Sequence, residues 1–119
     1  METLRKRADF LRAAKAARAP TPAFLLQARK RDADDGVDPE VIRVGYTCSK
    51  KIGNAVARNR AKRRLREIAR DTLALHAQAG WDYVLVGRPE VTLSHPFMQM
   101  QEELAAALSR IHSPRKRGA

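Results

Sequence analysis

The sequence has one cysteine and no long hydrophobic run, and these two absences exclude several classes of protein. Cys48 alone cannot form an intramolecular disulfide, and its place in an alternating apolar run predicts a small buried strand residue. No stretch approaches the roughly 20 apolar residues that span a bilayer. The opening residues, METLRKRADF, are charged and lack the apolar segment of a secretory signal. We therefore expect a cytoplasmic protein that does not insert into a membrane.

Residue patterns that carry enzyme or metal chemistry are missing as well. The sequence contains no paired carboxylates, no His-Glu-x-x-His motif, no cysteine and histidine cluster and no nucleophile constellation. Its acidic cluster, at residues 32–40, lacks the spacing of a calcium-binding EF-hand. The histidines show no ligand spacing. The pattern predicts no catalytic residue and no metal ligand in this chain.

Negative charge is scarce relative to positive charge. The 119 residues include 24 lysines and arginines but only 13 aspartates and glutamates, which gives a net charge of +11. A small domain needs a net charge of about 2 to 8 in magnitude for solubility, so this excess indicates a polyanionic partner. RNA, DNA and an anionic membrane all remain open on charge alone. The ordinary apolar content favours a folded domain over a disordered basic tail.

Apolar periodicity predicts one domain, over residues 1–112, of class α+β or α/β, with helices packed on a small sheet. The predicted order is a short helix capped by Asp9, strands at 23–29 and 41–48, a long helix capped by Asn54, a strand at 81–87 and a last helix within 94–112. We expect Pro20 to end the first helix and Gly80 to end the long one. The remaining segments are expected to be irregular: frayed residues 1–8, an acidic loop at 31–40 and a basic disordered tail at 113–119.

The long helix predicted after Asn54 has two unlike faces. One apolar stripe at helical spacing predicts the side that packs on the sheet: Ala61, Leu65, Ile68, Thr72 and Leu75. The opposite arc carries Asn59, Arg63, Arg66 and Arg70, with Arg60 and Lys62 on its two sides. Arg58 and Arg64 flank the stripe, where their stems can lie along apolar surface.

The charge of this segment predicts a nucleic-acid surface. Residues 50–70 hold nine cations and one acid, a net charge of +8. Same-sign neighbours three or four residues apart destabilise a helix by about 0.2–0.5 kcal/mol per pair, so a purely structural helix gains nothing from them. Arginine suits two-pronged phosphate contacts, and Lys50 and Lys51 beside the helix start offer a second anion site. An interfacial membrane helix is disfavoured, because the one apolar stripe is needed for the core.

The segment SKKIGNAVARNRAKRRLRE closely resembles the signature of the bacterial ribonuclease P protein subunit, including its Arg-Asn-Arg motif at Arg58, Asn59 and Arg60. Three flanking segments look like the same family: KRADF before the first helix, VIRVGYTCSKK leading into the motif, and WDYVLVGRP after it. The resemblance covers most of the chain. Composition and the basic helix alone leave two other interpretations open, a ribosomal or assembly protein that coats structured RNA and a basic DNA-binding domain.

The resemblance implies an α+β fold, a two-layer α/β sandwich with a small mixed sheet. An N-terminal helix, a C-terminal helix and a long Arg-Asn-Arg helix in a left-handed βαβ crossover would pack on this sheet. It also implies a protein subunit that binds a catalytic RNA 1:1 and assists it in removing the 5′ leader of precursor tRNA. Magnesium would be held mainly by the RNA subunit and the substrate, with none in the protein itself.

Carried over by position, the resemblance assigns roles to three groups of residues. Contacts to the catalytic RNA are expected from Arg58, Asn59, Arg60, Lys62, Arg63 and Arg66. The helix entrance, close to the substrate, would hold Lys50, Lys51 and Asn54. The cleft for the leader would be lined by Phe10 and Phe24, whose rings can stack bases, with further contacts from Arg43, Thr47 and Arg88. The sequence departs from the family pattern at Ala14 and Gln27, where aromatic residues are common, which implies less stacking in that cleft.

Overall fold

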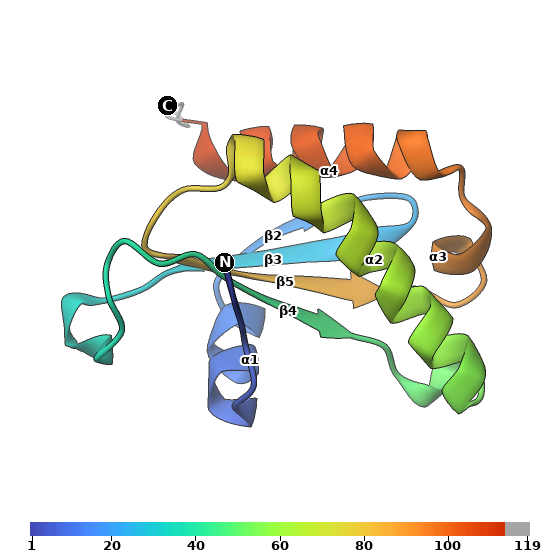
Figure 1. The fold of residues 1–119 in the computed structure, drawn as a ribbon, viewed down its shortest axis with the longest axis horizontal. Helices are drawn as coiled ribbons and strands as arrows, with labels where there is room; N and C mark the ends of the chain where they lie inside the picture. Colours follow the sequence, from blue (N-terminus) through green and yellow to red (C-terminus); the bar gives the residue numbers. More distant parts are fainter. Residues whose placement is uncertain (114–119) are drawn as a thin grey trace.

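The computed structural model describes residues 1–113, and their centre is a five-stranded sheet with the strand order β1-β4-β5-β3-β2 (Figure 1). The strands are β1 (Glu2–Thr3), β2 (Ala17–Pro20), β3 (Phe24–Lys30), β4 (Arg43–Thr47) and β5 (Trp81–Gly87). β4 runs parallel to its neighbours β1 and β5, whereas β3 runs antiparallel to β5 and β2, so the sheet is mixed. The tail expected at 113–119 lies, except for Ser113, outside the described residues.

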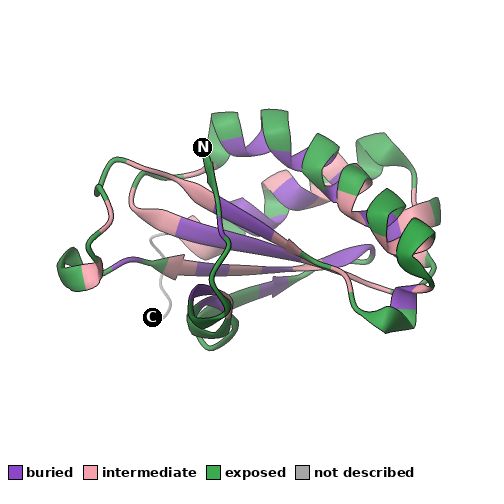
Figure 2. Ribbon diagram, turned by 60° about the horizontal axis from the view of Figure 1, so that its bottom comes forward, coloured by how far each residue is buried: buried purple, intermediate pink, exposed green. Residues whose placement is uncertain are grey.

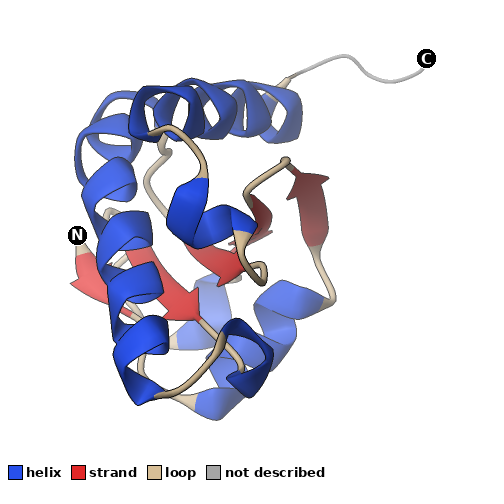
Figure 3. Ribbon diagram, turned by 90° about the vertical axis from the view of Figure 1, so that its right-hand side faces the viewer, coloured by secondary structure: helices blue, strands red, loops and turns tan. Residues whose placement is uncertain are grey.

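Helices lie on both faces of this sheet (Figures 2 and 3). The α-helices are α1 (Arg7–Ala14), α2 (Ala55–His76), α3 (Val91–Ser94) and α4 (Phe97–His112), and the 3₁₀ helices are η1 (Ala33–Asp35) and η2 (Lys50–Ile52). α2 and α4 pack beside each other over one face, and α1 lies against the other. The expected α+β class is confirmed: the sheet and the α2–α4 layer form the two-layer sandwich, and α1 adds cover on the second face.

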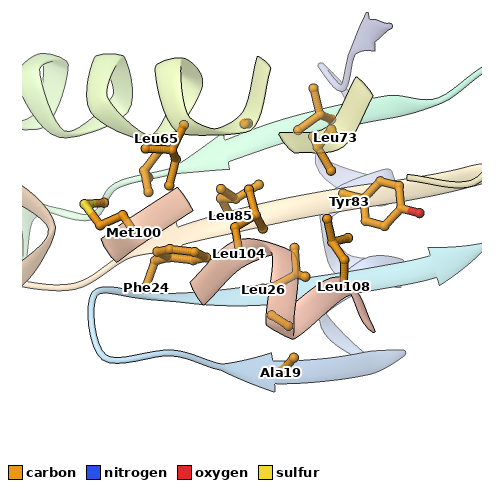
Figure 4. Close-up of a cluster of buried hydrophobic side chains, with 14 of the residues drawn as sticks. Ala19, Phe24, Leu26, Leu65, Leu73, Tyr83, Leu85, Met100, Leu104 and Leu108 are labelled. Carbon is orange, nitrogen blue, oxygen red and sulfur yellow. The ribbon is translucent and has the colours of Figure 1, made fainter. Parts of the chain in front are cut away.

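The main hydrophobic core fills the space between the sheet and the α2–α4 layer (Figure 4). Its large, fully buried side chains come from both layers: Phe24, Leu26, Leu65, Ile68, Leu73, Tyr83, Leu85, Met100, Leu104 and Leu108. The apolar stripe predicted for α2 is confirmed except at its end, where Leu75 is 79% exposed and Leu73 is buried instead. Because α4 packs beside α2, the buried face of α2 widens to include Ala69 and Leu73.

The connection from β4 through α2 to β5 has the rare hand. In Figure 1 the arrows of β4 and β5 both point to the right, β5 lies above β4, and α2 crosses on the viewer's side of the sheet. A chain that follows these three elements makes a left-handed crossover, whereas nearly all such connections are right-handed. The crossover expected from the family resemblance is therefore present, and it carries the basic segment across the sheet.

The N-terminal part differs most from the sequence-based expectation. The residues expected to be frayed include β1, and Leu4 is only 4% exposed, in a small second core with α1. The first helix begins at Arg7 with Lys6 as its N-cap, so the prediction that Asp9 caps it is wrong; the Asp9 carboxylate is buried against the sheet instead. Ala17–Pro20 leave the expected helix and pair with β3 as an edge strand, where a proline is tolerated.

Candidate nucleic-acid interface

Local backbone contacts build the entrance of α2. The Ser49 hydroxyl accepts a hydrogen bond from the N–H of Lys51 at 3.3 Å and begins η2. Gly53 has a φ of 146°, and a Cβ there would lie 2.9 Å from the Cβ of Ala57, so this turn requires glycine. Asn54 caps α2 as predicted, because its Oδ1 accepts a hydrogen bond from the N–H of Ala57 at 2.9 Å. The exposed residues gathered at this helix end are those expected there: Lys50, Lys51 and Asn54.

The outward side of α2 is exposed (Figure 2), and its residues there are mostly polar or charged. This α2 cationic face consists of Asn59, Arg60, Arg63, Arg66 and Arg70, with the half-buried Lys62 at its border. Within residues 1–113, no lysine or arginine of α2 forms an ion pair, although ion pairs occur elsewhere in the fold. An excess of positive over negative charge on one side of a helix creates a positive potential that attracts a polyanion.

Two other arginines of α2 are hydrogen-bonded within the fold. Arg58 donates one hydrogen bond to the carbonyl oxygen of Gly53 at 3.1 Å and helps to hold the helix entrance. Arg64 donates its Nε–H to the carbonyl oxygen of Thr92 at 2.9 Å and an Nη2–H to that of His95. Arg64 therefore fixes α3 and the turn after it against α2, whereas Arg58 bonds only to the turn before its own helix within residues 1–113.

Two adjoining hollows of about 370 and 360 Å³ lie at the free edge of β4, between α1 and α2. The pairing of β1 with β4 ends at Val44, so within residues 1–113 a strand pairs with Gly45–Thr47 on one side only. Both hollows are lined by Arg5, Phe10, Tyr46 and Lys62; one adds Thr3, Leu4 and Arg66, and the other adds Arg7, Thr47 and Cys48. None of these lining residues is acidic. We refer to the two hollows together as the β4-edge cleft.

Phe10 and Thr47 are the predicted leader-cleft residues that the structure brings together. The Phe10 ring lies directly on the sheet at Gly45, where a Cβ would approach the ring to 2.6 Å. A larger residue at position 45 would displace the Phe10 ring from this position. Phe10 remains half-buried, so its ring packs on the sheet and also lines the β4-edge cleft, in which Thr47 is exposed.

The prediction that Phe24 lines this cleft is wrong. Its side chain is fully buried in the main core, between the sheet and the α2–α4 layer (Figure 4). Alternation along β3 explains the placement, because Phe24, Leu26 and Ala28 point to the same face of the sheet, and α1 lies on the other face.

Arg43, also predicted to line the leader cleft, is not among the residues that line the β4-edge cleft. Its Nε and Nη2 donate to the carboxylate of Asp82 at 2.8 and 2.7 Å, and its Nη1 lies 3.5 Å from Asp9. Arg31 donates to the same Asp82 carboxylate at 2.8 Å, and Asp82 is fully buried. The hydrogen bond to Asp82 raises the pKa of Arg43, so it is a fixed cation. This Asp82 ionic cluster (Asp9, Arg31, Arg43 and Asp82) ties α1, β4, β5 and the residue that follows β3 together.

Arg88 and Cys48 also differ from expectation. Arg88 is half-buried just after β5, its backbone N–H donates to the Thr92 hydroxyl at 2.7 Å, and it is not among the residues that line the β4-edge cleft. Cys48 follows directly after β4 and is half-buried rather than buried. Burial raises the pKa of its thiol, which makes it a weak nucleophile.

Sequence reasoning missed Tyr46 and Arg5 as cleft residues. Tyr46 packs against the main core, as its alternation with Val44 predicts, but its ring also lines the β4-edge cleft. The guanidinium carbon of Arg66 lies 5.4 Å from the centre of that ring. Burial raises the pKa of the Tyr46 hydroxyl, which stays protonated at neutral pH. The sequence signal for Tyr46 was an aromatic residue in the strand before the basic helix. Only the strand order shows that this residue lies at a free edge of the sheet.

Two acids of the acidic loop are paired with one arginine within the fold. Arg29 lies 3.0 Å from the Asp35 carboxylate and 3.6 Å from that of Asp32. The backbone N–H of Asp32, which donates to Asp35 at 2.8 Å, holds the pKa of Asp35 below its usual value. Among the described residues, no three aspartate, glutamate, histidine or cysteine side chains are grouped so that they could hold a metal ion. None of the helices in that same part of the chain is long and apolar enough to cross a membrane.

Comparison with known proteins identifies the family. A family model described as Ribonuclease P matches residues 1–112. The ribonuclease P protein component of Ruegeria pomeroyi is 56% identical over 115 residues, which cover 97% of this chain and 90% of that protein. The corresponding protein of Paramagnetospirillum magneticum is 45% identical over 117 residues, which cover 98% of this chain and 86% of that protein.

Solved structures agree with this sequence similarity. The RNase P protein from Thermotoga maritima superposes with a TM-score of 0.73 at 29% identity, covering 95% of this chain and all of that one. The RNase P protein of Staphylococcus aureus gives a TM-score of 0.71 at 27% identity, covering 94% of this chain and 96% of that one. The resemblance seen in the Arg-Asn-Arg segment is confirmed over the whole domain. This chain belongs to the ribonuclease P protein family, the protein components of the ribonuclease P endoribonuclease.

Proposed function

We propose that this chain binds the catalytic RNA of ribonuclease P through the α2 cationic face and the helix entrance. The observation that carries the proposal is the set of exposed arginines on one side of α2, none of which has an acidic partner within residues 1–113. Arginine offers a planar fork that suits two-pronged contacts with phosphate. Arg58, Asn59 and Arg60 lie in the first two turns of α2, close to its capped start.

The chemistry is assigned to the RNA partner in this proposal. The catalytic RNA would hydrolyse the phosphodiester bond that joins the 5′ leader to the tRNA, with magnesium ions held by the RNA and the substrate. The chain contributes fixed cations that neutralise nearby phosphates, which lowers the magnesium concentration at which the two RNAs associate. One α2 cationic face per chain fits one copy of the chain per RNA molecule in the cytoplasm.

The β4-edge cleft is proposed to hold the single-stranded leader. The half-buried Phe10 ring offers a stacking surface, which contributes roughly 1–3 kcal/mol per base without demanding a particular sequence. Thr47 adds a hydroxyl group, and Lys50 and Lys51 lie a few residues further along, where η2 leads into α2. The cleft has no acidic lining residue to repel phosphates, which supports this assignment.

Single-turnover cleavage of a precursor tRNA at low magnesium tests the proposal. A bacterial catalytic RNA is assayed alone and with this chain, and the chain alone serves as the control. Strong stimulation by the chain, with no cleavage by the chain alone, is the expected result. If the chain binds RNA tightly and salt-sensitively but does not stimulate cleavage, a protein that only coats structured RNA is the better account.

A further inference from the structure

A hollow of about 330 Å³ lies between the acidic loop and the turn that joins α2 to β5. Its apolar lining comes from both segments: Ala33, Val37 and Pro39 of the loop, and Ala79 and Gly80 of the turn. A volume of this size falls within the range of about 300–1,000 Å³ that is typical of binding pockets. We refer to this space as the loop hollow, and the proposed RNA contacts do not involve it.

Hydrogen bonds hold the acidic loop in place over the hollow. Nη2 of Arg31 donates to the carbonyl oxygen of Asp38 at 2.9 Å and to that of Val41. The backbone N–H of Gly80 donates to the same Val41 carbonyl oxygen at 3.1 Å, which joins the loop to the turn. The hollow is therefore formed within the fold itself, so that a ligand loses less affinity to the ordering of the loop.

Arg31, which also lines the loop hollow, has one N–H group that the fold leaves without an acceptor. Its Nη1 donates to the carbonyl oxygen of Trp81 and to the Asp82 carboxylate. Its Nε is buried and has no hydrogen-bond partner among residues 1–113, on a side chain that is only 3% exposed. A buried donor without an acceptor costs free energy, so a ligand that brings an oxygen atom into the hollow beside Arg31 gains affinity. The backbone carbonyl of a peptide is an acceptor of this kind.

The charge around the loop hollow is opposite to that of the rest of the chain. Residues 30–40 contain two bases and five acids, a net charge of −3, so the other 108 residues carry +14 of the total of +11. Three of the acids, Asp34, Asp38 and Glu40, are exposed and form no ion pair within residues 1–113. Acids this close together repel one another and also repel phosphate groups, so they suit a cationic partner that is not a nucleic acid.

We infer that the loop hollow is a docking site for a basic segment of a partner protein, which inserts one apolar side chain. This side chain packs against Val37 and Ala79, and a backbone carbonyl of the segment accepts a hydrogen bond from Nε of Arg31. Lysines or arginines on either side of the apolar residue face Asp34 and Glu40. Apolar contact supplies the affinity of such a segment, and the surrounding acids select a basic one.

The site is separate from the proposed RNA contacts. In Figure 1 the acidic loop is at the far left, whereas α2 begins at the lower right, where the Arg-Asn-Arg motif lies. A partner at the loop hollow therefore leaves the start of α2 free for RNA. The inference goes beyond the proposed function and does not depend on it.

Binding of a short basic peptide to the full chain tests the site. The probe is the fluorescently labelled peptide Lys-Arg-Lys-Leu-Lys-Arg-Lys, in which the central leucine is the apolar side chain, and fluorescence anisotropy at low ionic strength measures its affinity. A second peptide has serine in place of the leucine. We expect the serine peptide to bind the unsubstituted chain about 10-fold more weakly, because it cannot fill the hollow. Equal affinities of the two peptides would overturn the inference.

Variants at exposed positions separate the apolar part of the site from the charged part. Ala79→Leu adds bulk to the wall of the hollow and should weaken the leucine peptide about 10-fold, while the serine peptide changes little. Asp34→Asn combined with Glu40→Gln should weaken both peptides by about 3- to 10-fold, and less at high salt. Glu102→Gln, at an exposed acid of α4, is the matched control and should bind like the unsubstituted chain. If the loop variants are folded and bind the leucine peptide like this control, the inference is wrong.

Two further measurements exclude other occupants of the hollow. The loop variants should bind the catalytic RNA at least as tightly as the unsubstituted chain, because they remove no cation; weaker RNA binding would place RNA at the loop and overturn the inference. Sedimentation should show the same mass for the unsubstituted chain and for Ala79→Leu. Self-association that is lost in Ala79→Leu would instead make a second copy of the chain the occupant, which also overturns the inference.

Discussion

The chain uses arginine in two ways, in the α2 cationic face and in the Asp82 ionic cluster. In the cluster, Arg31 and Arg43 each lie within 3 Å of the buried carboxylate of Asp82, at 2.8 and 2.7 Å. On the α2 cationic face, no arginine has a carboxylate partner within residues 1–113. The number of arginines in a segment therefore does not locate an interface. The position of the acids shows which arginines are already paired within the fold, as Arg31 and Arg43 are.

Two adjacent arginines of α2 differ in the same way, since one is exposed and the other is bonded within the fold. Arg63 is exposed and contributes nothing to packing, whereas Arg64 is half-buried and hydrogen-bonded to carbonyl oxygens of Thr92 and His95. A step of about 100° around the helix turns one side chain to solvent and the next to α3. Substitutions in the two regions should therefore separate stability from RNA binding.

Removing the acid from the ionic cluster should have the largest effect. Asp82→Asn keeps the shape of the side chain but leaves the buried Arg31 and the half-buried Arg43 without this carboxylate. We expect the free energy of unfolding to fall by roughly 3–5 kcal/mol, the usual cost of breaking a buried ion pair from one side. Urea denaturation measures this loss. Asp34→Asn, in the exposed acidic loop, is the matched control and should change stability by less than about 0.5 kcal/mol. A loss below about 1 kcal/mol at position 82 would show that the cluster is not tightly coupled.

Truncating Arg64 should have the next largest effect. Arg64→Ala removes two hydrogen bonds from a charged donor to carbonyl oxygens, so we expect a loss of about 2 kcal/mol in the free energy of unfolding. The neighbouring Arg63→Ala should change stability by less than about 0.5 kcal/mol, because its side chain is exposed. Thermal and urea unfolding of the two variants provide the test. Equal losses would contradict the division of α2 into an inner and an outer set of arginines.

Truncating outward arginines should weaken RNA binding and leave stability unchanged. Arg60→Ala combined with Arg63→Ala removes two exposed cations, so we expect about tenfold weaker binding of the catalytic RNA. The slope of log affinity against log salt concentration should become shallower by about 2 for the double variant. Filter binding over a range of salt concentrations measures both quantities. Arg18→Ala is the matched control, since Arg18 is an exposed arginine on β2, at the opposite edge of the sheet. If Arg18→Ala weakens binding as much as a single substitution on α2, the charge acts without regard to position.

The α2 region was predictable because its signals are local. The Asn54 cap, the apolar stripe from Ala61 to Thr72 and the outward arginines all follow from spacing within one helix. The same spacing misplaced Leu75, because it could not include the contact of α2 with α4. Helical periodicity therefore predicted almost all residues of the exposed face of α2, but only part of its buried face.

The strand residues were less predictable because their roles depend on partners far along the chain. Arg43 reads as the polar side of a half-buried strand, but its partner Asp82 lies 39 residues away on β5. Alternation put Phe24 on one face of β3 without saying which face meets α1. Tyr46 reads as a core residue until the strand order shows that β1 leaves its edge open. Short strands such as β1 and β2 depend on pairing with β4 and β3, so local propensity does not show them.

Protonating a side chain on the packed side of the fold, where no acid compensates the charge, should lower the stability of the fold. The smallest such loss that we predict is at His112. Its Nε2 lies 2.7 Å from the Tyr83 hydroxyl, and its ring meets the Trp81 ring edge-on. Burial lowers the pKa of His112 below its usual value, so the unfolded chain binds a proton at a pH where the folded chain does not. Stability should therefore be complete above about pH 6.5 and decline as the pH falls toward the lowered folded pKa.

Because the ring is partly exposed, we expect a loss of about 0.5 kcal/mol or less. Urea unfolding at about pH 7.5 and 5.5 measures it, and His112→Gln should show a smaller decline than the unsubstituted chain. Identical declines in the two proteins would show that protonation at this position is tolerated without an acid.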